Sequence, residues 1–125
     1  MAQIVQRDIL SQHPSQPTVP VTVGMDYTVI VQAIDLLRFD RKTFTLQNTG
    51  ATALSACLVE VSPKAPGESA DADYETVDST TFATLGAGAI LSFQVGIDSH
   101  RTFRIRGKVA AGSTTVIPYV TAGAI

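Results

Sequence analysis

The chain has 125 residues, a length that fits one ordinary domain and excludes a multi-domain enzyme. A composition of 45% hydrophobic and 16% charged residues excludes a disordered chain and leaves much of the surface to Thr, Ser and Gln. The formal net charge of −2 lacks the basic excess of a nucleic-acid binder, so we expect no nucleic-acid partner. No stretch approaches the roughly 18 apolar residues that span a bilayer, and the N-terminus has no secretory pattern. We therefore expect no membrane partner and synthesis in a cytoplasm.

The first twenty residues differ from the rest of the chain. Three prolines within residues 14–20, separated by Ser, Gln, Thr and Val, predict an extended spacer. Apolar residues on an arm ahead of this spacer invite strand addition to another sheet. We predict an N-terminal arm and spacer over residues 1–20 and a single domain over residues 21–125. The arm is expected to contact a partner, with folding back on its own domain as the alternative, through Ile4, Val5, Ile9 and Leu10.

From residue 21 onward, short segments rich in β-branched residues alternate with turn signals. No segment has a sustained 3.6-residue apolar period, so the fold class is predicted to be all-β, an antiparallel β-sandwich. Pro118 predicts an edge strand or a bulge, and Asn48-Thr49-Gly50 predicts a turn with Gly50 at positive φ. Residues 35–41 are ambiguous between a helical turn and a strand edge, and Lys42 is expected at the surface. The expected strands are residues 21–23, 27–34, 42–48, 54–61, 74–77, 80–85, 89–95, 102–109 and 114–121.

No residue pattern predicts catalysis, a cofactor or a metal site. Cys57 is a lone cysteine in an apolar strand and is expected to be buried. Asp98-Ser99-His100 is only superficially a triad, because consecutive turn residues point in different directions. An acidic run could hold a weak divalent cation, although a solvated loop is the favoured interpretation; it consists of Asp71, Asp73, Glu75 and Asp78. We therefore expect a protein that is not an enzyme.

Two surface features could instead bind a partner. Alternate residues of the 102–109 strand share one face, so Arg104, Arg106 and Lys108 form a candidate contact stripe for an acidic surface or a phosphate. The favoured alternative is a solvent face with cross-strand pairing to acids such as Glu60 or Glu75. The long loop of residues 62–73 is of the kind that often forms an interaction surface. A sugar-stacking platform is disfavoured because the chain has no Trp; it would use Tyr27, Tyr74 and Tyr119.

Short patterns over most of residues 20–123 resemble a known group of proteins. The segments Val-Thr-Val-Gly at residues 21–24, Val-Ile-Val at 29–31 and Arg-Lys-Thr-Phe-Thr-Leu-Gln-Asn-Thr-Gly at 41–50 resemble small virion proteins of tailed bacteriophages. Leu-Gly-Ala-Gly-Ala at residues 85–89, followed by Phe93, is similar to a turn and strand of many Ig-like domains.

The resemblance implies an Ig-like sandwich and a non-enzymatic structural role. The leading hypothesis is a capsid decoration or cement protein, located on the virion surface and stabilising the head shell through its arm and sandwich surface. Its partners would be the major capsid protein or other virion proteins, and it would form a homo-oligomer such as a trimer. One alternative is a neck, tail or head-fibre component. Another, from a different class, is a carbohydrate-binding or adhesin module.

Overall fold

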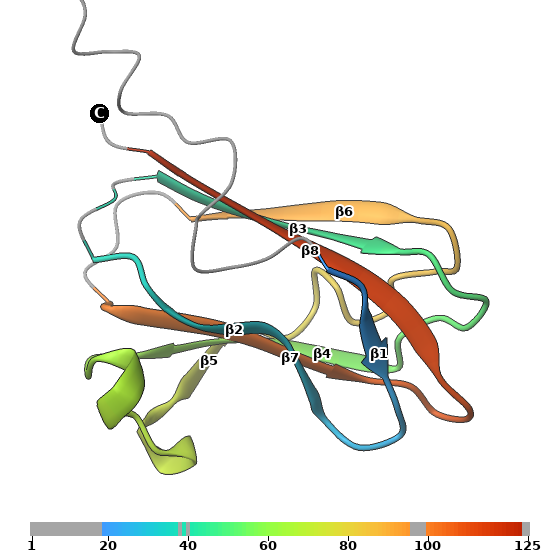
Figure 1. Ribbon diagram of the computed structural model, residues 1–125, viewed down its shortest axis with the longest axis horizontal. Coiled ribbons are helices and arrows are strands. Elements are labelled where there is room, and N and C mark those ends of the chain that lie inside the picture. The colour runs from blue at the N-terminus through green and yellow to red at the C-terminus, as the bar shows by residue number, and fades with distance from the viewer. Residues whose placement is uncertain (1–18, 38, 40, 96–99, 124–125) are drawn as a thin grey trace, which may run out of the picture.

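The computed structural model describes residues 19–37, 39, 41–95 and 100–123 (Figure 1). These residues form short β-strands and two single-turn 3-10 helices, η1 (Pro66–Glu68) and η2 (Asp71–Asp73), within the predicted loop. The strands are β1 (Val21–Val23), β2 (Thr28–Asp35), β3 (Arg41–Asn48), β4 (Ala56–Ser62), β5 (Glu75–Asp78), β6 (Ile90–Val95), β7 (Thr102–Lys108) and β8 (Thr114–Gly123).

The strands form two four-stranded antiparallel sheets that pack face to face (Figure 1). Sheet A has the order β1-β8-β3-β6, and sheet B has the order β2-β7-β4-β5. Each strand n therefore pairs with strand 9 − n, as if one long hairpin had been rolled up. Two sheets built in this way form a jelly roll. The predicted all-β antiparallel sandwich is confirmed.

The finer expectation of an Ig-like arrangement is not met. Ig domains of the constant type divide their strands into sheets of four and three with a different order, whereas the described residues give two sheets of four. Alternation along one strand specifies which side chains point inward, but it does not specify which distant strand lies alongside. The Ig-like and jelly-roll topologies therefore leave similar local patterns in a sequence.

The core fills the space between the two sheets. Phe44 of sheet A and Phe103 of sheet B meet there with ring centroids 5.6 Å apart. Lys42 also points inward and is buried, with its Nζ 5.2 Å from the Phe103 ring centroid, so the expectation of a surface lysine was wrong. Its place follows from alternation, because Lys42 is in phase with the core residues of β3. Other fully buried core residues are Val23, Ile30, Val31, Leu46, Val59, Val61, Ile105, Val116 and Val120.

The structure differs from one predicted strand and defines part of one ambiguous segment. Residues 80–85 form bends and turns rather than a strand, because Asp78 accepts hydrogen bonds from the Thr80 and Thr81 N–H groups and starts a turn. The apolar residues in this segment, Phe82 and Leu85, are buried and belong to the core. In the ambiguous region, β2 ends at Asp35 and β3 begins at Arg41, while residues 38 and 40 lie outside the described part of the chain.

Pro118 lies in β8, which is a central strand and not an edge strand. Backbone N–H groups of an antiparallel strand point alternately to its two neighbours. Asn48 donates its N–H to the Ala89 carbonyl, on the side of β6, so the backbone groups of Asn48 and Leu46 both point to β6. Pro118 lies opposite Leu46, and its backbone groups therefore point away from β3. On that side, the β1 ladder has already ended at Val116. The missing N–H of Pro118 therefore removes no hydrogen bond from either ladder.

Asn48 joins the predicted turn after β3 to two other segments, which contain Leu85 and Thr114. Its side chain is completely buried and its Nδ2 donates to the carbonyls of Thr52 (2.8 Å) and Leu85 (3.1 Å). Its Oδ1 accepts from Gly50 N–H (3.1 Å) and the Thr114 hydroxyl (2.7 Å). Gly50 does not have a positive φ, contrary to the prediction. It is glycine because a Cβ there would collide with the Thr114 hydroxyl and lie 2.7 Å from the Thr115 nitrogen.

We predict that Asn48→Ala lowers the free energy of unfolding by about 2–3 kcal/mol, because buried donors and acceptors lose their partner. Urea denaturation measures the change. Gln47→Ala, on the outer face of the same strand, is the control and should change stability by less than about 0.5 kcal/mol. Equal effects of the two substitutions would show that the Asn48 side chain does not hold these segments together.

Candidate interaction surface

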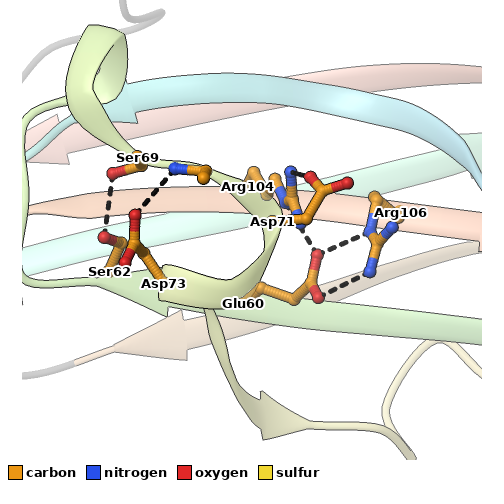
Figure 2. Close-up of polar contacts among 8 residues, drawn as sticks. Glu60, Ser62, Ser69, Asp71, Asp73, Arg104 and Arg106 are labelled. Atoms are coloured by element: carbon orange, nitrogen blue, oxygen red, sulfur yellow. Dashed lines mark hydrogen bonds and ion pairs between the residues drawn. The ribbon is translucent and has the colours of Figure 1, made fainter.

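The outer face of sheet B carries an ion-pair cluster centred on Glu60 of β4. Both Arg104 and Arg106 of β7 donate from Nε to the same oxygen, Glu60 Oε1, at 2.8 and 2.7 Å (Figure 2). Arg106 Nη2 also donates to Oε2 at 2.9 Å. Glu60 is only 4% exposed, so the cluster is largely withdrawn from water. A buried carboxylate needs such partners, because a charge without them is costly in the protein interior.

The loop between β4 and β5 lies over one end of this cluster. Asp71 of η2 accepts a hydrogen bond from Arg104 Nη1 at 2.9 Å, and the Arg104 guanidinium stacks 3.7 Å from the Tyr74 ring centroid. Nearer the start of the loop, the Thr102 hydroxyl donates to the Lys64 carbonyl at 2.6 Å. The hydroxyls of Ser62 and Ser69 share a hydrogen bond of 2.8 Å. These contacts cover part of the outer face of sheet B.

The structure thus places the candidate stripe of Arg104, Arg106 and Lys108 in a row, as alternation predicts. The three residues differ in burial and in the groups that they contact. Arg104 is buried and Arg106 is half-buried, and both pair with Glu60, which is the favoured alternative of the sequence analysis. Lys108 has its Nζ 4.8 Å from the ring centroid of Tyr27. Contact of this stripe with a partner remains a prediction.

The acidic run is dispersed among separate local contacts. Asp73 pairs with Lys64 Nζ at 3.0 Å, and Glu75 lies 4.0 Å from His100 Nε2. Hydrogen bonds from Arg104 to Asp71 and from the Ala70 backbone to Asp73 lower the pKa of each carboxyl. Within the described ranges, no three His, Cys, Asp or Glu side chains are grouped so as to hold a metal ion.

The other sequence candidates show no reactive arrangement. Burial, followed by the charge of Asp78, raises the pKa of Cys57 to about 12, so its thiol stays protonated and a weak nucleophile. Asp98 and Ser99 lie outside the described residues, as do the arm residues Ile4, Val5, Ile9 and Leu10. No helix among the residues that the structure describes is long and apolar enough to cross a membrane.

The outer face of sheet A differs sharply from that of sheet B, because its side chains are almost all uncharged. Cross-strand rows run over three adjacent strands: Ile117, Gln47 and Ile90 in one row, and Tyr119, Thr45 and Ser92 in the next. A hydrogen bond of 2.7 Å joins the hydroxyls of Thr45 and Ser92. Arg41 is the one charged member among the outward-facing described residues of the four strands, which also include Thr22, Thr43, Gln94, Thr115 and Thr121.

Sequence reasoning missed this face as a candidate surface, although it noted how few charges the chain has. Apart from Arg41 and Gly123, the outward positions of β3, β6 and β8 are Thr, Ser, Gln, Tyr and Ile, a pattern visible in the alternating segments. What the sequence did not contain is that these three strands are neighbours. Because the three strands are adjacent, their outward side chains form one surface that is uncharged apart from Arg41, which we call the sheet A face.

Comparison with known proteins identifies the fold and no family. No protein-family model matches the chain, and no curated protein matches its sequence. A mutant of chitosan-binding module 1, from a chitosanase/glucanase of Paenibacillus sp. IK-5, is similar with a TM-score of 0.50 and 13% identity, covering 91% of this chain and 100% of that chain. PirA is similar with a TM-score of 0.49 and 13% identity, covering 84% of this chain and 90% of that chain. The SPBc2 prophage-derived protein YomS is similar with a TM-score of 0.45 and 12% identity, covering 86% of this chain and 97% of that chain.

We predict that Glu60→Gln lowers the free energy of unfolding by about 2–4 kcal/mol, because two guanidinium groups lose the charge that compensates them. Thermal or urea unfolding measures the change. Glu68→Gln, at an exposed position of η1, is the matched control and should stay within about 0.5 kcal/mol of the parent. Two equally small effects would mean that the cluster contributes little to stability.

The loop between β4 and β5 should loosen in acid. Asp71 has a lowered pKa in the folded protein, so its contribution is fully present above its ordinary pKa of about 3.9 and is lost as the pH falls through the lower folded value. We expect the hydrogen-exchange protection of residues 63–74 to fall as the pH drops below about 4. Asp71→Asn should reduce this protection already at pH 7, whereas the control Asp26→Asn should not. Unchanged protection in Asp71→Asn would contradict the prediction.

Proposed function

We propose that this protein is a non-enzymatic structural component of a tailed-bacteriophage virion, and that it decorates the outer surface of the head shell. The virion assignment rests on the resemblance of residues 21–24, 29–31 and 41–50 to small virion proteins. The jelly roll agrees with it by analogy only, since viral capsid proteins and lectins both use this fold. The observation that carries a docking role is the uncharged sheet A face.

The sheet A face has the chemistry of a protein-protein contact. The buried centres of such interfaces are depleted in charged residues, because each charge must be stripped of water. Tyr119 lies opposite Thr45 and between Ile117 and Thr121 on the same face, so the centre of this face is free of charge. The arm of residues 1–20 would supply a second, linked contact through its apolar residues. Two linked contacts bind more tightly than either alone, and binding that favours the assembled shell stabilises it by mass action.

The alternatives differ in what they require of the molecule. A neck, tail or head-fibre component would use the same surfaces at a lower copy number. A carbohydrate-binding module is favoured only by the fold that this chain shares with the chitosan-binding module. Its expected tyrosine platform does not form, because Tyr27 and Tyr74 lie against Arg106 and Arg104 on sheet B, whereas Tyr119 is on sheet A.

The copy number in virions tests the proposal directly. Quantitative mass spectrometry of purified particles should give a ratio to the major shell protein of the same order as one. A ratio lower by ten-fold or more would place the protein in the neck, tail or fibres. Complete absence from particles would reject both virion hypotheses and favour glycan binding.

Two variants test the proposed contacts. Removal of residues 1–12 should abolish binding to undecorated shells while the domain still folds, as judged by circular dichroism. Thr45→Lys, which places a charge at the centre of the sheet A face, should weaken binding at least ten-fold. Thr76→Lys, at an exposed position of β5 in sheet B, is the control. Parent-like binding by both test variants would reject these surfaces as the contacts.

A further inference from the structure

Among the strands that the structure describes, four lie at sheet edges, and three of them are protected against the addition of another strand. Exposed edges are usually blunted by shortness, bulges or charges. β1 has only three residues, and β2 is interrupted by two register shifts. β5 has four residues, carries Glu75 and Asp78, and pairs with β4 through a register shift.

β6 has none of these features. Its six residues, Ile90–Val95, contain no charge and no proline, and they pair with β3 without a register shift. Two aliphatic side chains on it are unusually exposed, Ile90 at 56% and Leu91 at 43%. Such an edge is open to pairing with another chain.

The register of β6 shows which backbone groups face outward. Asn48 N–H donates to the Ala89 carbonyl, so Ala89 faces β3. Since the direction alternates along an antiparallel strand, Leu91, Phe93 and Val95 also direct their backbone groups to β3. Ile90, Ser92 and Gln94 therefore direct their N–H and C=O groups to the open edge.

These residues fit an identical strand running in the opposite direction. A strand that pairs with itself about a two-fold axis brings its own charges close together, and β6 alone among the edge strands longer than three residues has none. With the axis at Ser92, all outward-facing backbone groups find partners, because Ile90 lies opposite the partner's Gln94. On the other side of the sheet, Leu91 lies opposite the partner's Phe93, which covers an exposed leucine.

We propose that β6 is a homodimerisation strand, through which two copies pair antiparallel about a two-fold axis at Ser92. The dimer contains one continuous eight-stranded sheet, and the two sheet A faces become a single larger uncharged surface. The contact is much smaller than a standard interface, so the dimer is weak and depends on concentration. This inference does not depend on the proposed virion role, because it concerns two copies of this chain alone.

A charge swap at the axis tests both the pairing and its register. In sedimentation velocity, the full-length parent should shift from monomer toward dimer as its concentration rises to about 1 mM. Ser92→Lys or Ser92→Glu alone places like charges opposite each other and should weaken dimerisation at least ten-fold. An equimolar mixture of the two variants should restore it. The same pair of substitutions at Ser113, an exposed turn position, is the control and should have no effect.

Disulfide trapping provides a second readout. Directly opposed residues of a hydrogen-bonded pair have Cα atoms about 5.5 Å apart, which suits a disulfide. Ser92→Cys should form a covalent dimer under mild oxidation much faster than Ser113→Cys, and the natural Cys57 is buried. A parent that stays monomeric at all concentrations, or Ser92→Cys that cross-links no faster than the control, overturns the proposal. Weakening by both charges without rescue on mixing also overturns it, because β6 would then bind a different segment.

Discussion

The buried carboxylate of Glu60 organises the outer face of sheet B. It accepts hydrogen bonds from two arginines of the neighbouring strand while being 4% exposed. Because a desolvated charge must be compensated, the two guanidinium groups are held against sheet B. Arg104 in turn holds Asp71 and Tyr74, and through them the long loop after β4. The apparent basic stripe of β7 is therefore largely part of the internal structure of sheet B.

The same arrangement explains why the outer face of sheet A carries fewer charges than that of sheet B. The chain is only 16% charged, and several of its charges are used in the cluster on sheet B. Short hydroxyl side chains and a central tyrosine then remain for the sheet A face. β6 belongs both to this face and to the unprotected edge, so contact through the edge would enlarge the face and leave it open.

The pairing of strand n with strand 9 − n also determines at which edge of sheet A the chain enters the domain. β1 lies at one edge of sheet A and β6 at the other, with β8 and β3 between them (Figure 1). The arm precedes β1, so it joins the domain at the edge opposite the proposed dimer strand.

Much of the fold could be predicted from the sequence, because side-chain alternation is a local property of a strand. Residues 42–48 alternate as expected, and the all-β sandwich, the long loop and the buried Cys57 follow from local patterns. Strand pairing was decided only by the tertiary structure, because hydrogen bonds between segments far apart in the chain leave no local signal. For that reason the jelly-roll order, the central position of Pro118, the close approach that requires Gly50, and the uncharged face across β8, β3 and β6 became visible only when the strands were placed side by side.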